Sequence, residues 1–323
     1  MNGSRYVIYK VAIIYRVNND GWYKCMEIIK IDSVGDYINS IKKLIEQHES
    51  VAEIYSRTEY LFRGQSSEEY ELIPSLGRLG AGQSDIYFAE RNMISMAKRK
   101  MPNVFTNDMQ PLELLGTLQH YGIPTRLLDI TENALVALYF ACVGDKEKAK
   151  NGEVFIFKND IYDVSTYPMD LAIAESYKYA KPSNWSLKLF YTEVTKQVYF
   201  DEQRASIDCE DDIKGALWVE RCCANPIFTY APYRLTRQLI QSGRYIIFPN
   251  KIEHVSDTEP GMFLSRIESI DKASDCVVGR MVIPSEKKDD LLKELRMLGI
   301  DKSVLFADSV DIVCEEIKKK YFR

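Results

Sequence analysis

The sequence is poor in histidine, and its cysteines follow no pattern. The three histidines are His48, His120 and His254, and the seven cysteines occupy positions 25, 142, 209, 222, 223, 276 and 314. There is no C-x-x-C pair, and the histidines lie far apart, so no metal site of the usual zinc-ligand spacing is expected. The odd number and irregular spacing of the cysteines predict reduced thiols rather than a disulfide framework.

Long apolar runs are also missing. No stretch of the chain approaches the roughly 20 apolar residues that a membrane-spanning helix needs. The first ten residues, MNGSRYVIYK, lack the basic segment, apolar segment and small-residue cleavage site of a secretory signal. A cytoplasmic protein without a membrane partner is therefore expected.

Neither sign of charge is in large excess. Lysine and arginine total 42 against 47 aspartates and glutamates, a net charge of -5, and 46% of the residues are hydrophobic. This composition is typical of a globular protein. A mildly acidic chain has no general attraction for phosphate backbones, so nucleic-acid binding would require a local basic patch.

The pattern along the chain predicts one main domain preceded by a short extension. β-prone runs around a turn at Asn19-Asp20-Gly21 predict a hairpin or short meander over residues 5–31, so residues 1–30 are interpreted as an N-terminal β-hairpin extension. Residues 33–50 have the three- and four-residue apolar spacing of a surface helix. No repeat or low-complexity linker divides residues 31–323, which favours a single domain there.

Within that domain, strands and helices alternate irregularly. Residues 59–63, 153–157 and 244–248 are predicted to be central strands. Residues 133–142 predict a helix that is apolar on every side and is therefore buried beneath those strands. Together they indicate an α+β fold of mixed or antiparallel sheets packed with helices. Further helices are predicted at 85–99, 111–121 and 233–241, no clear element is predicted in the polar stretch 158–216, and residues 277–323 predict an α/β end piece.

Two motifs resemble those that define the FRG domain, a bacterial and phage family named after a Phe-Arg-Gly tripeptide. They are LFRGQ at 61–65 and QHYGIPTRLLD at 119–129. Weaker similarity runs from residue 30 to 320. The chain departs from the family pattern at Ile130, where an aromatic residue is usual, and at Ala134, where proline is frequent. Both changes spare charged and hydrogen-bonding groups, so only local repacking is expected.

A second, weaker resemblance is to ADP-ribosyltransferases of the arginine-serine-glutamate class. In those enzymes the first core strand ends in an aromatic-Arg-Gly tripeptide whose arginine holds the NAD pyrophosphate, and residues 60–64 are similar to that strand end. The order of elements over 125–157 is similar too. The catalytic glutamate of these enzymes lies in a Gln/Glu-x-Glu setting, and QSG at 241–243 stands in that place. The resemblance implies an ADP-ribosyltransferase-like fold and NAD as the cofactor.

The two resemblances implicate a set of residues in binding and catalysis. The candidates for binding NAD or a nucleotide are Phe62, Arg63, Gly64, Gln65, Tyr121, Thr125, Arg126, Thr131 and Arg237. The candidates for catalysis are Arg63, His120, Asp129 and Gln241. Arg63, His120, Arg126 and Asp129 are expected to converge on one pocket.

Several of these residues have a structural interpretation beside the functional one. A strand-end guanidinium such as Arg63 can form a two-point contact with phosphate, or it can pair with a buried carboxylate such as Asp129. His120, in the last turn of a helix, is either a catalyst or a partner of the helix dipole. Asp129 can position Arg63 or Arg126, whereas general-base chemistry would require a raised pKa.

The polar residues around 131 and 241 have alternatives as well. Gln241 can orient a nucleophile or an amide but cannot act as a general base. The resemblance makes Thr131 the counterpart of a nucleotide-orienting serine, and its structural alternative is to cap the following helix. Asn133 is expected to cap that helix. Gly243, between a helix and a strand, is expected at positive φ.

The leading hypothesis is an NAD- or nucleotide-binding, ADP-ribosyltransferase-like effector of a bacterial toxin or anti-phage defence system. Its site would need a phosphate clamp from Arg63 and Arg126, an aromatic floor from Tyr121 or Phe62, and a carboxylate that the sequence does not assign. The alternatives are a non-catalytic module that senses a nucleotide or nucleic acid, and a protein–protein adaptor with an exposed apolar patch and no deep pocket. A nucleic acid or a protein is the expected acceptor.

Overall fold

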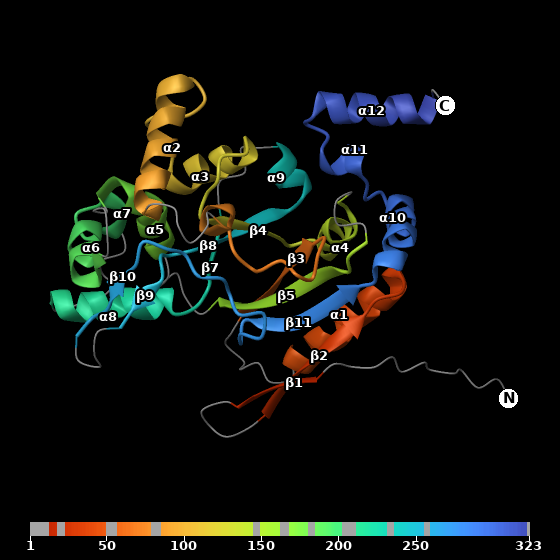
Figure 1. The fold of residues 1–323 in the computed structure, drawn as a ribbon, viewed down its shortest axis with the longest axis horizontal. Helices are drawn as coiled ribbons and strands as arrows, with labels where there is room; N and C mark the ends of the chain where they lie inside the picture. The colour runs from red at the N-terminus through yellow and green to blue at the C-terminus, as the bar shows by residue number, and fades with distance from the viewer. Residues whose placement is uncertain are drawn as a thin grey trace.

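The computed structural model shows a mixed sheet flanked by two groups of helices (Figure 1). The structure describes residues 13–17, 23–49, 57–78, 85–144, 149–161, 168–179, 185–201, 211–230, 236–254 and 259–321. Within these ranges, no helix combines the length and the apolarity that crossing a membrane requires.

The main sheet has eight strands. Their order across the sheet is β1 (Ile13–Val17), β2 (Tyr23–Lys30), β11 (Val277–Ile283), β5 (Gly152–Ile161), β3 (Arg57–Gln65), β4 (Leu127–Thr131), β8 (Gly243–Ile247) and β7 (Ile227–Thr229). All neighbours are antiparallel except β2 and β11. A smaller sheet has the order β6 (Trp185–Ser186), β10 (Met262–Phe263) and β9 (Ile252–Glu253).

The main sheet is split near its middle. β3 is paired with β5 along its whole length, from Arg57 to Gln65, and β4 is paired with β8 along all of its length. Between β3 and β4, by contrast, the register contains one pair, Phe62 with Thr131. The two halves of the sheet therefore diverge on either side of this pair and leave room between the strands for side chains from both.

Helix α4 (Ala134–Cys142) packs directly against β3. Asn133 caps it, since its side-chain oxygen accepts hydrogen bonds from the amides of Leu135 and Val136. β3 approaches the helix so closely that a Cβ added to Gly64 would lie 1.8 Å from the carbonyl oxygen of Ala137. Most of the helix is buried, which explains why its apolar residues face every direction.

The remaining helices form two groups at opposite ends of the sheet (Figure 1). One group contains α2 (Ile86–Lys100), α3 (Pro111–His120), α5 (Met169–Tyr179), α6 (Leu187–Val194), α7 (Val198–Asp201) and α8 (Asp212–Cys223). The other contains α1 (Val34–Glu49), α4, α10 (Lys288–Met297), α11 (Lys302–Leu305) and α12 (Val310–Tyr321). The short helix α9 (Thr236–Ile240) precedes β8, and single 3-10 turns lie at Ser75–Arg78 and Ser285–Lys287.

The α+β prediction is confirmed, with three differences of detail. The strands at 59–63 and 153–157 are central, but β8 lies next to the edge strand β7. The stretch 158–216 contains helices where none was predicted. Positive φ occurs at Ser242 (47°) instead of Gly243, because the turn between α9 and β8 comes one residue earlier than expected.

The N-terminal hairpin is present in the part of it that the structure describes. β1 and β2 pair antiparallel, from Ile13 with Glu27 to Val17 with Tyr23. β2 also pairs in parallel with β11, which joins the hairpin to the main sheet. The rest of the expected hairpin, residues 5–12 and 18–22, lies outside the described residues.

Candidate functional site

A cavity of about 360 Å³ opens where β3 and β4 diverge. Its walls come from β3, β4, β8, α3, α4, α9 and the residue that follows α11. Eight of the predicted site residues line it: Phe62, Arg63, Gly64, His120, Asp129, Thr131, Arg237 and Gln241. The split sheet thus brings the Phe-Arg-Gly motif together with His120 and Asp129 of the second motif.

Arg63 lies near the end of β3, partly buried at the split. Its Nη1 donates a hydrogen bond of 2.5 Å to the backbone carbonyl oxygen of Asp129, and within the described residues its buried Nε has no partner. Burial lowers the pKa of the guanidinium to about 10, against the opposing effect of the Asp129 carboxylate. One part of the guanidinium therefore supports β4, and Nε is a buried donor that no acceptor among the described residues satisfies.

Asp129 lies on β4 between two buried residues, Leu128 and Ile130, and is itself exposed to the cavity. Protein surrounds the cavity on its other sides, and this loss of bulk water raises the pKa of the carboxyl group. Arg63 and a hydrogen bond from Gln119 partly offset the rise. A carboxylate with a raised pKa, open to a cavity and near an arginine, has the properties of a general base or of a group that stabilises developing positive charge.

His120 and Arg237 lie together at the rim of the cavity, beside Asp308. His120 Nε2 is 3.9 Å from one carboxylate oxygen of Asp308, and Arg237 Nε donates to the other at 3.2 Å. Burial and the charge of Arg237 lower the pKa of His120, with Asp308 acting in the opposite sense. His120 is therefore a neutral imidazole near pH 7, able to donate one N–H or to accept a proton.

Thr131 and Gln241 line the cavity but are already engaged. The Thr131 hydroxyl donates to the carbonyl oxygen of Gln241 at 2.6 Å and accepts from the amide of Asn133. The Gln241 side-chain nitrogen donates to the carbonyl oxygen of Leu305 at 3.0 Å. The contacts of Thr131 fit its structural interpretation, because they fix the turn between β4 and α4 and tie that turn to α9.

The prediction of a phosphate clamp is corrected at Arg126, because its side chain does not reach the cavity. It is fully buried and forms a two-point ion pair with Glu90, from Nε at 2.8 Å and from Nη2 at 2.6 Å. Its Nη1 donates to the carbonyl oxygen of Phe248 at 2.8 Å. The expected convergence of Arg126 with Arg63 was wrong. Leu127 and Leu128 separate Arg126 from Asp129, so the two side chains lie on opposite sides of β4. On its side, Arg126 pairs with the buried carboxylate of Glu90.

Three more of the predicted binding residues lie outside the cavity lining. Thr125 is buried, and its hydroxyl donates to the side-chain oxygen of Gln119. Gln65 is buried, and its side-chain nitrogen donates to the carbonyl oxygen of Tyr70 at 3.0 Å. Tyr121 is 59% exposed, so the aromatic floor expected from it is absent. Thr125 and Gln65 help to hold the two motifs in place, and none of the three residues lines the cavity.

Sequence reasoning missed several residues of the lining. Gln119 precedes His120 in the second motif and could have been chosen from its position there. Phe140 was predicted as part of a buried helix, and Phe306 lies within the weaker family similarity near the end of the chain, which assigned it no role in the site. Arg244 lines the cavity while its guanidinium bonds to Glu59 and lies 3.3 Å from the ring centroid of Tyr230.

A larger cavity of about 490 Å³ lies elsewhere, around the segment that joins β8 to β9. It is more open to solvent and contains none of the predicted site residues. The smaller cavity is therefore the candidate functional site, because it combines enclosure with converging polar groups.

Comparison with known families agrees with the first motif-based interpretation. The family model of the FRG domain matches residues 58–150, so this part of the chain is an FRG domain. No curated protein and no solved structure matches the chain. The matched range contains β3, α3, β4 and α4, whereas Arg237, Gln241 and Phe306 are contributed by the chain beyond it.

Proposed function

From the FRG domain at residues 58–150, we propose that the chain binds NAD through this cavity and acts as an ADP-ribosyltransferase-like enzyme on its N-glycosidic bond. The observation that carries the proposal is the meeting of Arg63 and Asp129 in one cavity at the split of the sheet. A phosphate-binding cation and a carboxylate with a raised pKa are two groups that such chemistry requires.

Arg63 is the proposed contact for the NAD phosphates. Its Nε is buried and unpartnered within the described residues, so a phosphate oxygen there satisfies a donor that otherwise costs free energy. Phe62 and Phe140 supply apolar surface for a planar ring. The cavity volume lies toward the small end of small-molecule sites, which suits part of a dinucleotide with the remainder exposed.

Asp129 is the proposed carboxylate that the sequence left unassigned. Breaking the bond between nicotinamide and ribose creates an oxocarbenium-like ribose, and a nearby carboxylate stabilises that positive charge. The same group can then accept a proton from the water or hydroxyl that attacks the ribose carbon. The acceptor is water, a protein side chain or a nucleic acid, in a toxin or anti-phage setting that the family resemblance suggests.

The contacts of Gln241 favour a second candidate, a nucleotide-sensing module without turnover. Gln241 occupies the position where related chemistry uses a glutamate, and its amide is held by the carbonyl oxygen of Leu305. A glutamine there can position a ligand but cannot remove a proton. In this alternative, Arg63 binds phosphate and nothing is cleaved.

Calorimetric titration with ADP-ribose tests the binding half of the proposal. We expect Arg63→Ala to abolish binding and Arg63→Lys to restore little of it, because lysine keeps the charge but loses the planar fork. Arg99→Ala, on the exposed face of α2, is the matched control and should bind as wild type does. Wild-type affinity in Arg63→Ala would contradict the proposal, and binding without cleavage of NAD would favour the sensing module.

A further inference from the structure

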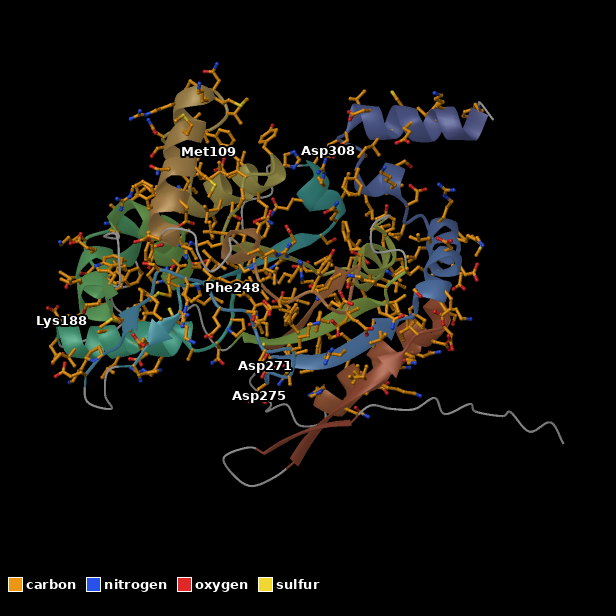
Figure 2. All side chains as sticks on the ribbon, viewed as in Figure 1. Met109, Lys188, Phe248, Asp271, Asp275 and Asp308 are labelled. Carbon is orange, nitrogen blue, oxygen red and sulfur yellow. The ribbon has the colours of Figure 1, made fainter. Side chains whose placement is uncertain are left out.

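The side chain of Arg237 is tied to the C-terminal segment by two hydrogen bonds and a cation–π contact. Its Nε donates to Asp308, its Nη2 donates to the hydroxyl of Ser309 at 2.6 Å, and its guanidinium carbon lies 4.9 Å from the ring centroid of Phe306. These partners belong to the short link between α11 and α12, where Figure 2 labels Asp308 close to α9. A side chain that lines the cavity thus attaches this link to α9.

The same link closes one side of the cavity. Phe306 lies in the lining, with its ring edge-to-face against Phe140 at 6.3 Å between centroids, and Leu305 accepts the hydrogen bond from Gln241. Beyond Ser309, α12 stands at the outer edge of the molecule, clear of the main sheet (Figure 1). The contacts with Arg237, Gln241 and Phe140, together with the buried side chain of Leu305, therefore hold the segment 305–309 in place.

Asp308 and Ser309 together hold the positions that an anionic ligand would need. Nε and Nη2 are the two nitrogens that an arginine uses for a two-point contact with phosphate, and both are taken by residues 308 and 309. His120 adds a nearby imidazole, 3.9 Å from the Asp308 carboxylate. All three side chains are half-buried, at 27% exposure for Arg237, 17% for His120 and 19% for Asp308.

We propose that Arg237 and His120 form an anion subsite at the rim of the cavity, that Asp308 occupies it as the chain's own anion, and that a diphosphate group of the ligand displaces Asp308. This deepens the proposed function, on which it rests for the choice of a diphosphate. The displacement frees the link 305–309 from Arg237 and loosens the attachment of α12. Ligand binding and release of the C-terminal helix are then coupled through one guanidinium.

Titration with inorganic pyrophosphate tests the subsite without requiring turnover. Asp308→Asn removes the competing charge with little change of shape, so we expect pyrophosphate to bind roughly tenfold more tightly than to wild type. Asp311→Asn removes one charge from the first turn of α12 without touching Arg237, and should bind as wild type does. Arg237→Ala in the Asp308→Asn background should abolish the gain.

Hydrogen exchange tests the coupling. Saturating pyrophosphate should speed amide exchange over residues 305–321 in wild type, and Asp308→Asn should show faster exchange there without ligand. Equal affinity of wild type and Asp308→Asn, no binding to either, or unchanged exchange over 305–321 at saturation would overturn the inference. If the expected pattern appears but NAD is not cleaved, the proposed function fails and the subsite stands. If NAD is cleaved and Asp308→Asn has no effect, the reverse holds.

Discussion

At the scale of residues, the arginines of the two motifs, Arg63 and Arg126, have opposite environments. Arg126 is enclosed with Glu90, whereas Arg63 reaches the cavity with one nitrogen unpartnered in the described chain. Both were predicted to bind phosphate. A motif shows which residues are present but not which side of a strand each side chain occupies, so the sequence could not separate the two arginines. Side chains alternate between the two sides of β4 and of the residues that lead into it. This alternation places Arg126 beside Glu90, which is distant in sequence, and not in the cavity.

Arg126→Ala should therefore lower stability and not ligand affinity. It leaves the Glu90 carboxylate buried and unpaired, which costs about 3–5 kcal/mol. Chemical denaturation of the variant measures the loss, and adding Glu90→Leu to Arg126→Met should recover most of it because no buried charge then remains. A variant with wild-type stability but lost ADP-ribose binding would return Arg126 to the phosphate clamp.

Because the pKa of Asp129 is raised in the folded protein, the stability of the protein should depend on pH through this group. Since the pKa of the folded state lies above that of the unfolded state, the unfolded chain loses this proton first as pH rises. The free energy of unfolding associated with this group is greatest at low pH and falls as pH rises through the folded-state pKa. Asp129→Asn removes the effect, so it should melt above wild type at pH 7 and approach wild type near pH 3.5.

Thermal melts of both proteins between about pH 3 and 8 measure this difference. A lower melting temperature for Asp129→Asn at pH 7 would show that the carboxylate stabilises the fold, and would remove the evidence for a raised pKa.

At the scale of elements, the glycine of the Phe-Arg-Gly motif has a packing reason. A Cβ on Gly64 would lie 1.8 Å from the carbonyl oxygen of Ala137, a backbone atom that cannot yield without moving α4. β3 and α4 both line the cavity, so their close contact sets its shape. The motif therefore combines a cavity-lining arginine with a glycine that lets the strand approach the helix.

Gly64→Ala should destabilise the protein through that clash. We expect a loss of about 1–3 kcal/mol, the usual cost of overpacking, and weaker ADP-ribose binding because Arg63 shifts with the strand. Differential scanning calorimetry checks the first effect. Gly35→Ala is the matched control, since an added Cβ there meets nothing closer than 3.7 Å. Equal melting temperatures for both variants would contradict the proposed contact.

The elements that could be predicted are those with a strong local signal. Pro111 and Gly122 bound α3, and Gly122 has the left-handed φ of 81° that its position after the helix predicts. Asn133 caps α4 as expected. Helices α5 to α7 were missed because their buried residues, such as Phe190, pack on partners far away in sequence, including Phe263.

At the scale of the whole molecule, the cavity depends on a feature that no local pattern contains. At the split, β3 and β4 share one register pair, whereas each is paired along its whole length with its other neighbour, β5 or β8. The FRG range supplies Arg63, His120 and Asp129, and the later chain supplies Arg237, Gln241 and Phe306. Motif resemblance indicated the first group and part of the second, while Phe306 becomes part of the site only through tertiary folding.

Release of nicotinamide from NAD by the purified protein is the measurement that tests the central claim most directly. The wild-type protein should release nicotinamide, and Asp129→Asn should lower kcat by about 100-fold or more while ADP-ribose still binds, as expected for loss of a catalytic carboxylate. Arg99→Ala should retain the wild-type rate. Folded wild-type protein that releases no nicotinamide above background, or an Asp129→Asn variant with the wild-type kcat, would contradict the account.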